Sequence, residues 1–175
     1  MGKFLALLIL VCALIGGGAM YYLQVYAYYD AIPASGPDDV QAVTLADGRS
    51  APLPHTDFQA IDSDSSPIRY RACFTTDLSL DALTAAYEGY EGAVPLLAPK
   101  WFDCFDARAI GAALEAGEAR AFLGTENIRY GIDRIIAVMP DGRGFVWQQI
   151  NRCGEVVFDG QPAPADCPPP PPQAD

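Results

Sequence analysis

The chain has 175 residues, enough for one globular domain and too few for two of ordinary size. Eleven Lys and Arg residues against 22 Asp and Glu residues give a net charge of −11, which argues against the clustered positive charge that nucleic-acid binding requires. Because 51% of the residues are apolar and 19% are charged, the chain is not disordered throughout. We expect one acidic folded domain with no nucleic-acid partner.

A long apolar run opens the chain. Residues 4–29 read FLALLILVCALIGGGAMYYLQVYAYY, and Gln24 is their one strongly polar side chain. A transmembrane helix needs about 20 apolar residues to cross a hydrocarbon core of roughly 30 Å, so this run is predicted to be a transmembrane helix. Lys3 precedes it, and the next basic residue is Arg49. The positive-inside rule therefore keeps residues 1–3 in the cytosol and places the rest of the chain across the membrane.

A cleaved signal peptide is the alternative interpretation of the same segment. Residues 4–15 would form its apolar core, and Gly17 and Ala19 fit the small-residue cleavage pattern. The run stays apolar well beyond Ala19, however, and the tyrosines that follow are typical of the aromatic belt at a membrane surface. We favour an uncleaved anchor. The alternative gives a secreted soluble protein, and both interpretations place the domain outside the cytosol.

Four cysteines follow the apolar run, and a fifth, Cys12, lies within it. An even number of cysteines in an oxidising compartment indicates two disulfides, for which three connectivities are possible. Proximity in sequence alone favours Cys73–Cys104 and Cys153–Cys167. No pair has the CxxC spacing of thiol oxidoreductases or zinc ribbons, so we expect structural bridges and no metal site.

The rest of the chain is predicted to be one α+β domain. Residues 30–39 contain Pro and Gly and should form a tether. Residues 40–159 should form a mostly antiparallel sheet with two helices. Strands are expected at residues 40–45, 58–61, 68–74, 120–123, 132–139, 145–150 and 155–158, and helices after the N-cap residues Ser79 and Asp106.

Two local patterns add detail to this domain. Leu80, Leu83, Tyr87 and Tyr90 recur at helical spacing and should form one buried stripe. Residues 140–144 read Pro-Asp-Gly-Arg-Gly, which predicts a tight turn and a hairpin between the two strands beside it.

A proline-rich tail, residues 160–175, contains five consecutive prolines. Such a sequence favours an extended polyproline II conformation without a packed core. We interpret the tail as a disordered spacer. The alternative is a ligand for an aromatic groove, because polyproline II loses little entropy when it docks.

Candidate catalytic residues are few, and each also has a structural interpretation. Asp103 and Asp106 lie three apart in the stretch WFDCFD, where they suit a cation or an acid–base pair; we favour a helix cap for Asp106. His55, the single histidine, suits a general base, but a solvated loop position is favoured. Arg69, Arg71, Arg129 and Arg134 lie near tyrosines and suit an anionic ligand, or pairing with surface carboxylates, which we favour.

The known motifs for nucleotide and nucleophilic chemistry are missing from the sequence. It has no Gly-rich phosphate loop and no GxSxG element. We therefore name no catalytic, cofactor-binding or metal-binding residue and expect no cofactor. Asp103, Asp106 and His55 remain weak candidates, and a non-enzymatic role is favoured.

The opening MGKFLALLILVCALIGGGAMYYLQVYAYY and the later IRYRACF, WFDCFDA, GIDRIIAVMPDGRGFVWQQIN and CGEVVFDG resemble an uncharacterised domain-of-unknown-function family of short single-pass bacterial membrane proteins. The resemblance covers nearly the whole chain and implies a topology without an activity. We expect an inner-membrane protein with its domain in the periplasm, where it is a binding or assembly module. Its partners are then the bilayer and another envelope protein. The alternative is a periplasmic carboxylate-dependent hydrolase.

Overall fold

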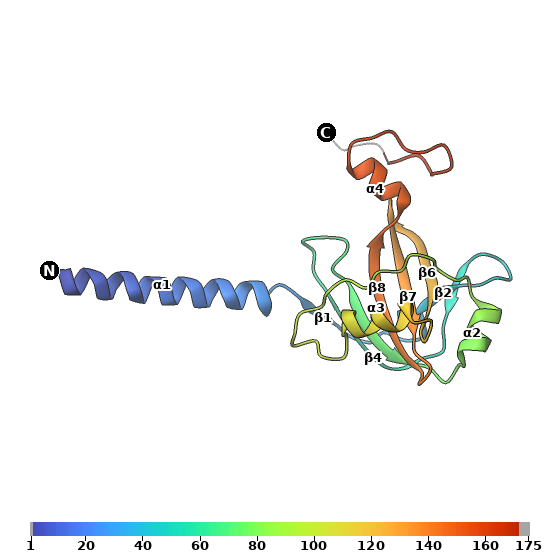
Figure 1. Ribbon diagram of the computed structural model, residues 1–175, viewed down its shortest axis with the longest axis horizontal. Coiled ribbons are helices and arrows are strands. Elements are labelled where there is room, and N and C mark those ends of the chain that lie inside the picture. Colours follow the sequence, from blue (N-terminus) through green and yellow to red (C-terminus); the bar gives the residue numbers. More distant parts are fainter. Residues whose placement is uncertain (1, 172–175) are drawn as a thin grey trace. The chain divides into compact units, whose positions relative to one another are not determined.

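The computed structural model describes residues 2–171, and the chain divides into two compact units, Met1–Asp30 and Ala31–Asp175. Helix α1 (Gly2–Val25) makes up most of the first unit, and none of its residues is buried (Figure 1). Its mean hydropathy reaches 2.3 over 18 residues. A helix of 24 residues with this composition is long and apolar enough to cross a membrane, as predicted. It ends at Val25, before the predicted limit at residue 29.

The second unit is an α+β domain built on a six-stranded sheet with the order β1-β4-β5-β8-β7-β6. Figure 1 labels β8, β7 and β6 next to one another in this sheet. The neighbours from β4 to β6 are all antiparallel. The strands of this sheet, in that order, are Asp30–Ile32, Thr56–Asp62, Arg71–Thr75, Arg143–Ile150, Ile132–Val138 and Arg120–Arg129. A second sheet pairs β2 (Gln41–Val43) with β3 (Ser50–Pro52), and the remaining elements are the 3-10 helix η1 (Pro37–Asp39), α2 (Leu80–Ala86), α3 (Ala107–Glu115) and α4 (Arg152–Phe158).

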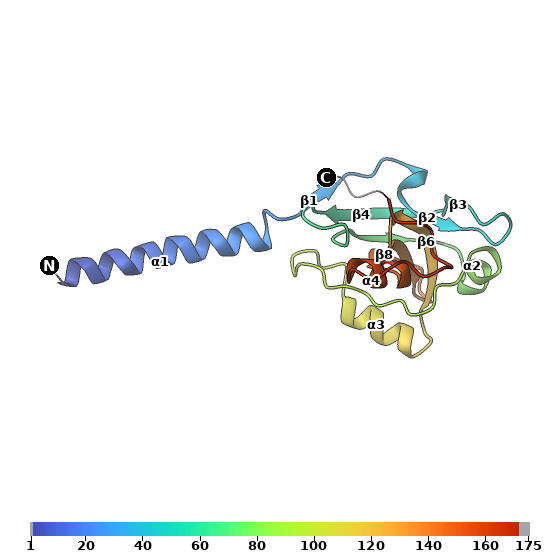
Figure 2. The ribbon, with the colours of Figure 1, turned by 90° about the horizontal axis from the view of Figure 1, so that it is seen from above.

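The six-stranded sheet is covered on both faces. Successive side chains of a strand point to opposite faces, so Ala72 and its register partner Val146 lie on one face and Cys73 and its partner Phe145 on the other. Figure 2 shows β2 and β3 on one side of the sheet and α3 on the other. The first face holds the main core: Val40, Ala42, Leu53, Ala60, Tyr70, Ala72, Phe74, Leu83, Phe122, Ile136, Val138 and Val146.

Aromatic side chains fill the second face, under α3. The ring centre of Phe105 lies 5.9 Å from that of Phe145 and 6.4 Å from that of Trp147, both edge-on. Ile110 on α3 is buried against the same layer. The apolar strand Ile132–Val138 therefore runs through the middle of the domain with both faces covered, as its composition predicted.

The two predicted helix caps are present. The Ser79 side chain accepts a hydrogen bond from the Ala82 amide (3.2 Å), and α2 begins at the next residue. Asp106 Oδ1 accepts from the amides of Arg108 (3.0 Å) and Ala109 (3.2 Å), at the start of α3. Both caps satisfy amides that the first turn of a helix leaves unpaired.

The predicted helical stripe was wrong beyond Leu83. Helix α2 ends at Ala86, and the chain then turns to pair its backbone with two strands. Tyr87 forms a bridge with Thr44, and the Tyr90 amide donates to the Ala121 carbonyl at 2.9 Å. Backbone pairing here satisfies the outer edge of β6, which would otherwise be open.

The predicted strand at residues 155–158 was also wrong, because these residues belong to α4. The Asn151 side chain accepts from the Gly154 amide at 3.0 Å and caps this helix. Gly154 packs so closely on Gly131 that a Cβ would lie 2.2 Å from the Gly131 carbonyl oxygen. The domain therefore has three α-helices among residues 31–171 where two were predicted.

Smaller differences concern segments that we expected to be loops. Strand β3 lies between the strands predicted at residues 40–45 and 58–61, where no strand was predicted, and β1 and η1 lie in the predicted tether at residues 30–39. Strand β5 begins at Arg71, later than predicted. Of the predicted tail, residues 172–175 lie outside the described residues, whereas residues 160–171 follow α4.

Candidate functional site: the groove beside α3

Residues 90–97, which we name the strap, cross the sheet without regular secondary structure. Side chains of the sheet hold them in place. Gln149 on β8 accepts from the Val94 amide (2.8 Å) and donates to the Gly92 carbonyl (3.0 Å). Arg71 on β5 donates to the carbonyls of Leu96 (2.9 Å) and Leu97 (3.1 Å). Two side chains from adjacent strands thus take the place of a backbone ladder.

Arg71 is buried, with 3% of its surface exposed. It also donates to the carbonyls of Ile68 (2.9 Å) and Tyr70 (2.7 Å), and its guanidinium carbon lies 5.8 Å from the ring centre of Phe105. We favoured pairing with surface carboxylates for this arginine, whereas its side chain is buried and four backbone carbonyls accept from it. The rigid guanidinium fork suits this position because it directs several donors to several carbonyls at once.

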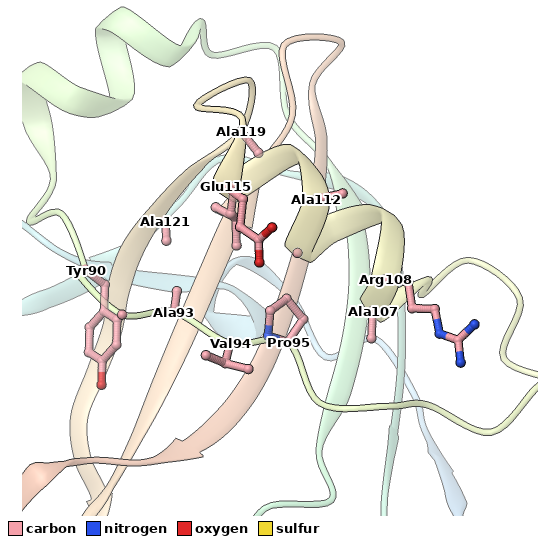
Figure 3. Close-up of a pocket in the computed structure, with 13 residues that line it drawn as sticks. Tyr90, Ala93, Val94, Pro95, Ala107, Arg108, Ala112, Glu115, Ala119 and Ala121 are labelled. Carbon is pink, nitrogen blue, oxygen red and sulfur yellow. The ribbon is translucent and has the colours of Figure 1, made fainter.

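A groove lies between the strap, α3 and the first residues of β6. Its volume is about 580 Å³. Small side chains line it from all three elements, including Ala93, Ala112 and Ala121 (Figure 3). Figure 3 also shows the Glu115 carboxylate over the groove near Pro95, whereas Arg108 points away from it. The groove is therefore open and mostly apolar, with the negative charge of Glu115 on one wall and Arg108 among its lining residues.

The strap also carries exposed apolar surface. Val94 is 59% exposed and lines the groove, and Leu97 is 72% exposed at the next pocket along. Isolated apolar side chains on a surface are ordinary, whereas these two lie three residues apart on one segment, at two adjoining pockets. The sequence alone does not distinguish Val94 and Leu97 from buried core residues, because their exposure depends on how Arg71 and Gln149 hold the strap.

The structure brings Asp103 and Asp106 to the wall of one pocket of about 690 Å³, next to the groove. Asp106 has the capping role that we favoured, so its Oδ1 is already bonded to two amides. Asp103 is exposed, and the intervening Cys104 is bridged to Cys73. Among residues 2–171, no group of three or more His, Cys, Asp or Glu side chains is arranged to hold a metal ion.

His55 lies in a different pocket, which shares no residue with the pocket of the two carboxylates. It is half-buried rather than freely solvated. Its Nδ1 lies 2.8 Å from the Leu53 carbonyl oxygen, and its ring packs edge-on against Phe58 and Phe74. The three weak candidates are therefore not assembled into one site.

Sequence reasoning missed a buried carboxylate, Asp133 on β7, which is 5% exposed. Its Oδ1 accepts from the Asn127 amide (2.9 Å) and from Asn151 Nδ2 (2.8 Å), and its Oδ2 accepts from the Tyr90 hydroxyl (3.1 Å). Burial, together with this carboxylate, raises the pKa of Tyr90. The network joins the start of the strap to Asn127 near the end of β6 and to Asn151, the α4 cap. The available signal was the charged pair Asp133 and Arg134 in a strand whose other residues are all apolar.

A second buried pair lies on the other face of the sheet. The guanidinium carbon of Arg134 is 4.2 Å from the ring centre of Tyr70, a distance typical of a cation–π contact. Burial lowers the pKa of Arg134 and raises the pKa of Tyr70 to about 12. Tyr70 belongs to the main core, and Arg134 covers its ring from a partly exposed position.

Taken together, the molecule is a disulfide-bridged α+β domain that follows an apolar helix able to cross a membrane. Residues 40–168 match DUF6446, a family of unknown function. The chain belongs to this family, and both disulfides lie within the matched residues. No curated protein and no solved structure matches the chain.

Proposed function

We propose that the protein is a single-pass protein of the bacterial inner membrane, with its amino terminus in the cytosol and its domain in the periplasm. The length and apolar composition of α1 support an anchor, and Lys3 supports this orientation. The disulfides Cys73–Cys104 and Cys153–Cys167 support an oxidising compartment, because such bridges persist outside the cytosol.

The domain is a non-enzymatic binding module whose groove beside α3 takes a segment of another envelope protein. The observation that carries this is the open groove with its exposed apolar strap, Val94 being 59% and Leu97 72% exposed. The segment that fits it has small apolar side chains for the floor and one basic side chain for Glu115.

Charge also favours a protein partner over the membrane surface. The chain after α1 carries ten basic and 22 acidic residues, a net charge of −12, because Lys3 is the one basic residue before Arg49. Anionic headgroups repel such a domain, whereas a basic partner segment is attracted to it.

The groove is tested by filling it. Ala112 lines the groove and Ala109 does not, although both are exposed on α3. Ala112→Trp and Ala109→Trp therefore cost the same helix propensity but differ in where the indole lies. Full-length protein is purified in mild detergent, and stoichiometric partners are identified by mass spectrometry. We expect Ala112→Trp to lose its partner and Ala109→Trp to keep it. Equal retention, or no partner with wild-type protein, would contradict the proposal.

The topology is tested separately. Alkaline phosphatase fused after the domain should be active in a bacterial host, because the enzyme needs an oxidising compartment. An inactive fusion would refute the orientation. Sequencing the amino terminus of the membrane-bound product should find residue 1 or 2; a product that begins after Ala19 would show that the segment is a cleaved signal peptide.

A further inference from the structure

Three contacts, two from α4 and one from Tyr130, hold residues 166–168 of the proline-rich segment, which we name its root. Cys167 forms a disulfide with Cys153 on α4. Asp166 Oδ2 forms an ion pair with Arg152 Nη2. The Tyr130 hydroxyl, in the β6–β7 turn, donates to the Pro168 carbonyl oxygen at 3.0 Å. Figure 1 shows this segment returning past α4.

The prolines beyond this root are exposed. Pro168–171 have no regular secondary structure, and all four are exposed. Each ring restricts φ to about −65°, and each proline also excludes the helical region for the residue before it. Such a run favours the polyproline II helix, which has about three residues per turn and a rise of about 3.1 Å per residue. Pro168 and Pro171 then lie on the same edge, one turn apart.

We infer that this run is a docking ligand for a partner protein whose groove is lined by parallel aromatic side chains. Proline rings pack on aromatic faces, and a run already in polyproline II conformation loses little entropy on docking. A spacer gains nothing from being anchored at its root. A ligand gains affinity from such anchoring, because the disulfide, the ion pair and the Tyr130 hydrogen bond restrict the run before it docks and so reduce the conformational entropy lost on docking.

The net negative charge of the chain favours basic side chains at the rim of the partner's groove. With 22 acidic and 11 basic residues in the chain, a basic side chain beside the aromatic groove complements the domain. This surface shares no residue with the groove beside α3, so it is a second, separate interaction surface.

The test is site-specific photo-crosslinking in the full-length protein. Benzoylphenylalanine replaces Ala165, which is exposed next to the root, or Ala85, which is exposed on α2 as the control. Membranes of the native host are solubilised in mild detergent and irradiated with and without a proline decapeptide or a Gly-Ser decapeptide of equal length. A third sample carries Pro169→Ala, Pro170→Ala and Pro171→Ala together and keeps the disulfide.

We expect a discrete protein adduct at position 165 and none at position 85. The proline peptide should abolish it, the Gly-Ser peptide should not, and the triple alanine variant should reduce it about tenfold. Mass spectrometry should map the adduct to a groove of Tyr or Trp residues. An adduct that resists the proline peptide, an adduct of equal yield in the triple variant, or no protein adduct would overturn the inference.

The contribution of the root contacts to docking is measured separately. Replacing Cys153 and Cys167 together by Ser unties the root without changing the prolines. The proline peptide should then release the partner at about a tenfold lower concentration, because the free run must be ordered on docking. An unchanged concentration would show that the root contacts do not serve the docking.

Discussion

Removing the Cys73–Cys104 disulfide should destabilise the domain strongly, because the bridge closes a long loop and holds a packed layer. It joins β5 to the segment before α3, across a sequence separation of 31 residues. The loop-closure entropy that a bridge of this length removes from the unfolded chain contributes about 3.7 kcal/mol to the free energy of unfolding at 25 °C. The Cys153–Cys167 loop, with a separation of 14, amounts to about 3.0 kcal/mol. The larger loss is expected at Cys73–Cys104, because Phe102 and Phe105 are buried in the segment that it holds.

The assay is urea unfolding of the full-length protein in detergent micelles, followed by tryptophan fluorescence. Trp147 is fully buried under α3 and reports on this layer. With a slope of about 2 kcal/mol per M, Cys73→Ser with Cys104→Ser should lower the midpoint by about 1.8 M. The control is Cys12→Ser, in α1 and outside the domain, which should leave the midpoint unchanged. A shift below about 0.5 M would refute the reasoning that this bridge limits the unfolded chain.

Substitutions at three further positions test other contacts by the same urea titration. Arg71→Lys keeps the charge but loses the guanidinium group that reaches the Leu96 and Leu97 carbonyls. We expect the free energy of unfolding to fall by about 2 kcal/mol and amide hydrogens in the strap to exchange faster. Exchange at the wild-type rate would contradict the role of Arg71 in holding the strap. Asp106→Ala should cost about 1 kcal/mol and Asp106→Asn much less, because Asn also caps helices; equal losses would point to a role for the charge. Burial raises the pKa of Tyr70 to about 12, so the folded state holds this proton more tightly than the unfolded chain, whose pKa is about 10. The stability from this group is complete below about pH 10 and falls as the pH rises toward 12, with about 1.4 kcal/mol lost by pH 11; Tyr70→Phe should lack that loss, and an identical pH profile would rule out the assignment.

Features that depend on neighbouring residues were predictable. The Ser79 and Asp106 caps each involve an amide two or three residues away, and the β7–β8 hairpin follows from the turn at residues 140–144. The apolar run predicted α1 because a membrane helix needs only length and composition. Both disulfide pairs also agree with proximity in sequence.

Features that depend on contacts between residues far apart in the sequence could not be predicted from it. Val156, Val157 and Phe158 suit a strand by composition, but the Asn151 cap and the contact between Gly131 and Gly154 place them in a helix. Arg71 looks like a surface residue in the sequence, although the carbonyls that it binds lie 25 and 26 residues away. The groove was unpredictable for the same reason, because its strap has no pattern of its own.

The way the strap is held ties the groove to the alignment of two central strands. Arg71 lies opposite Trp147 in the β5–β8 register, and Gln149 follows two residues later on the same face. A slip of β8 by a single position would turn Gln149 to the opposite face of the sheet. The strap would then lose its bonds at Gly92 and Val94 while the rest of the backbone pairing survived. Correct registration of the strands is thus a precondition for the shape of the groove.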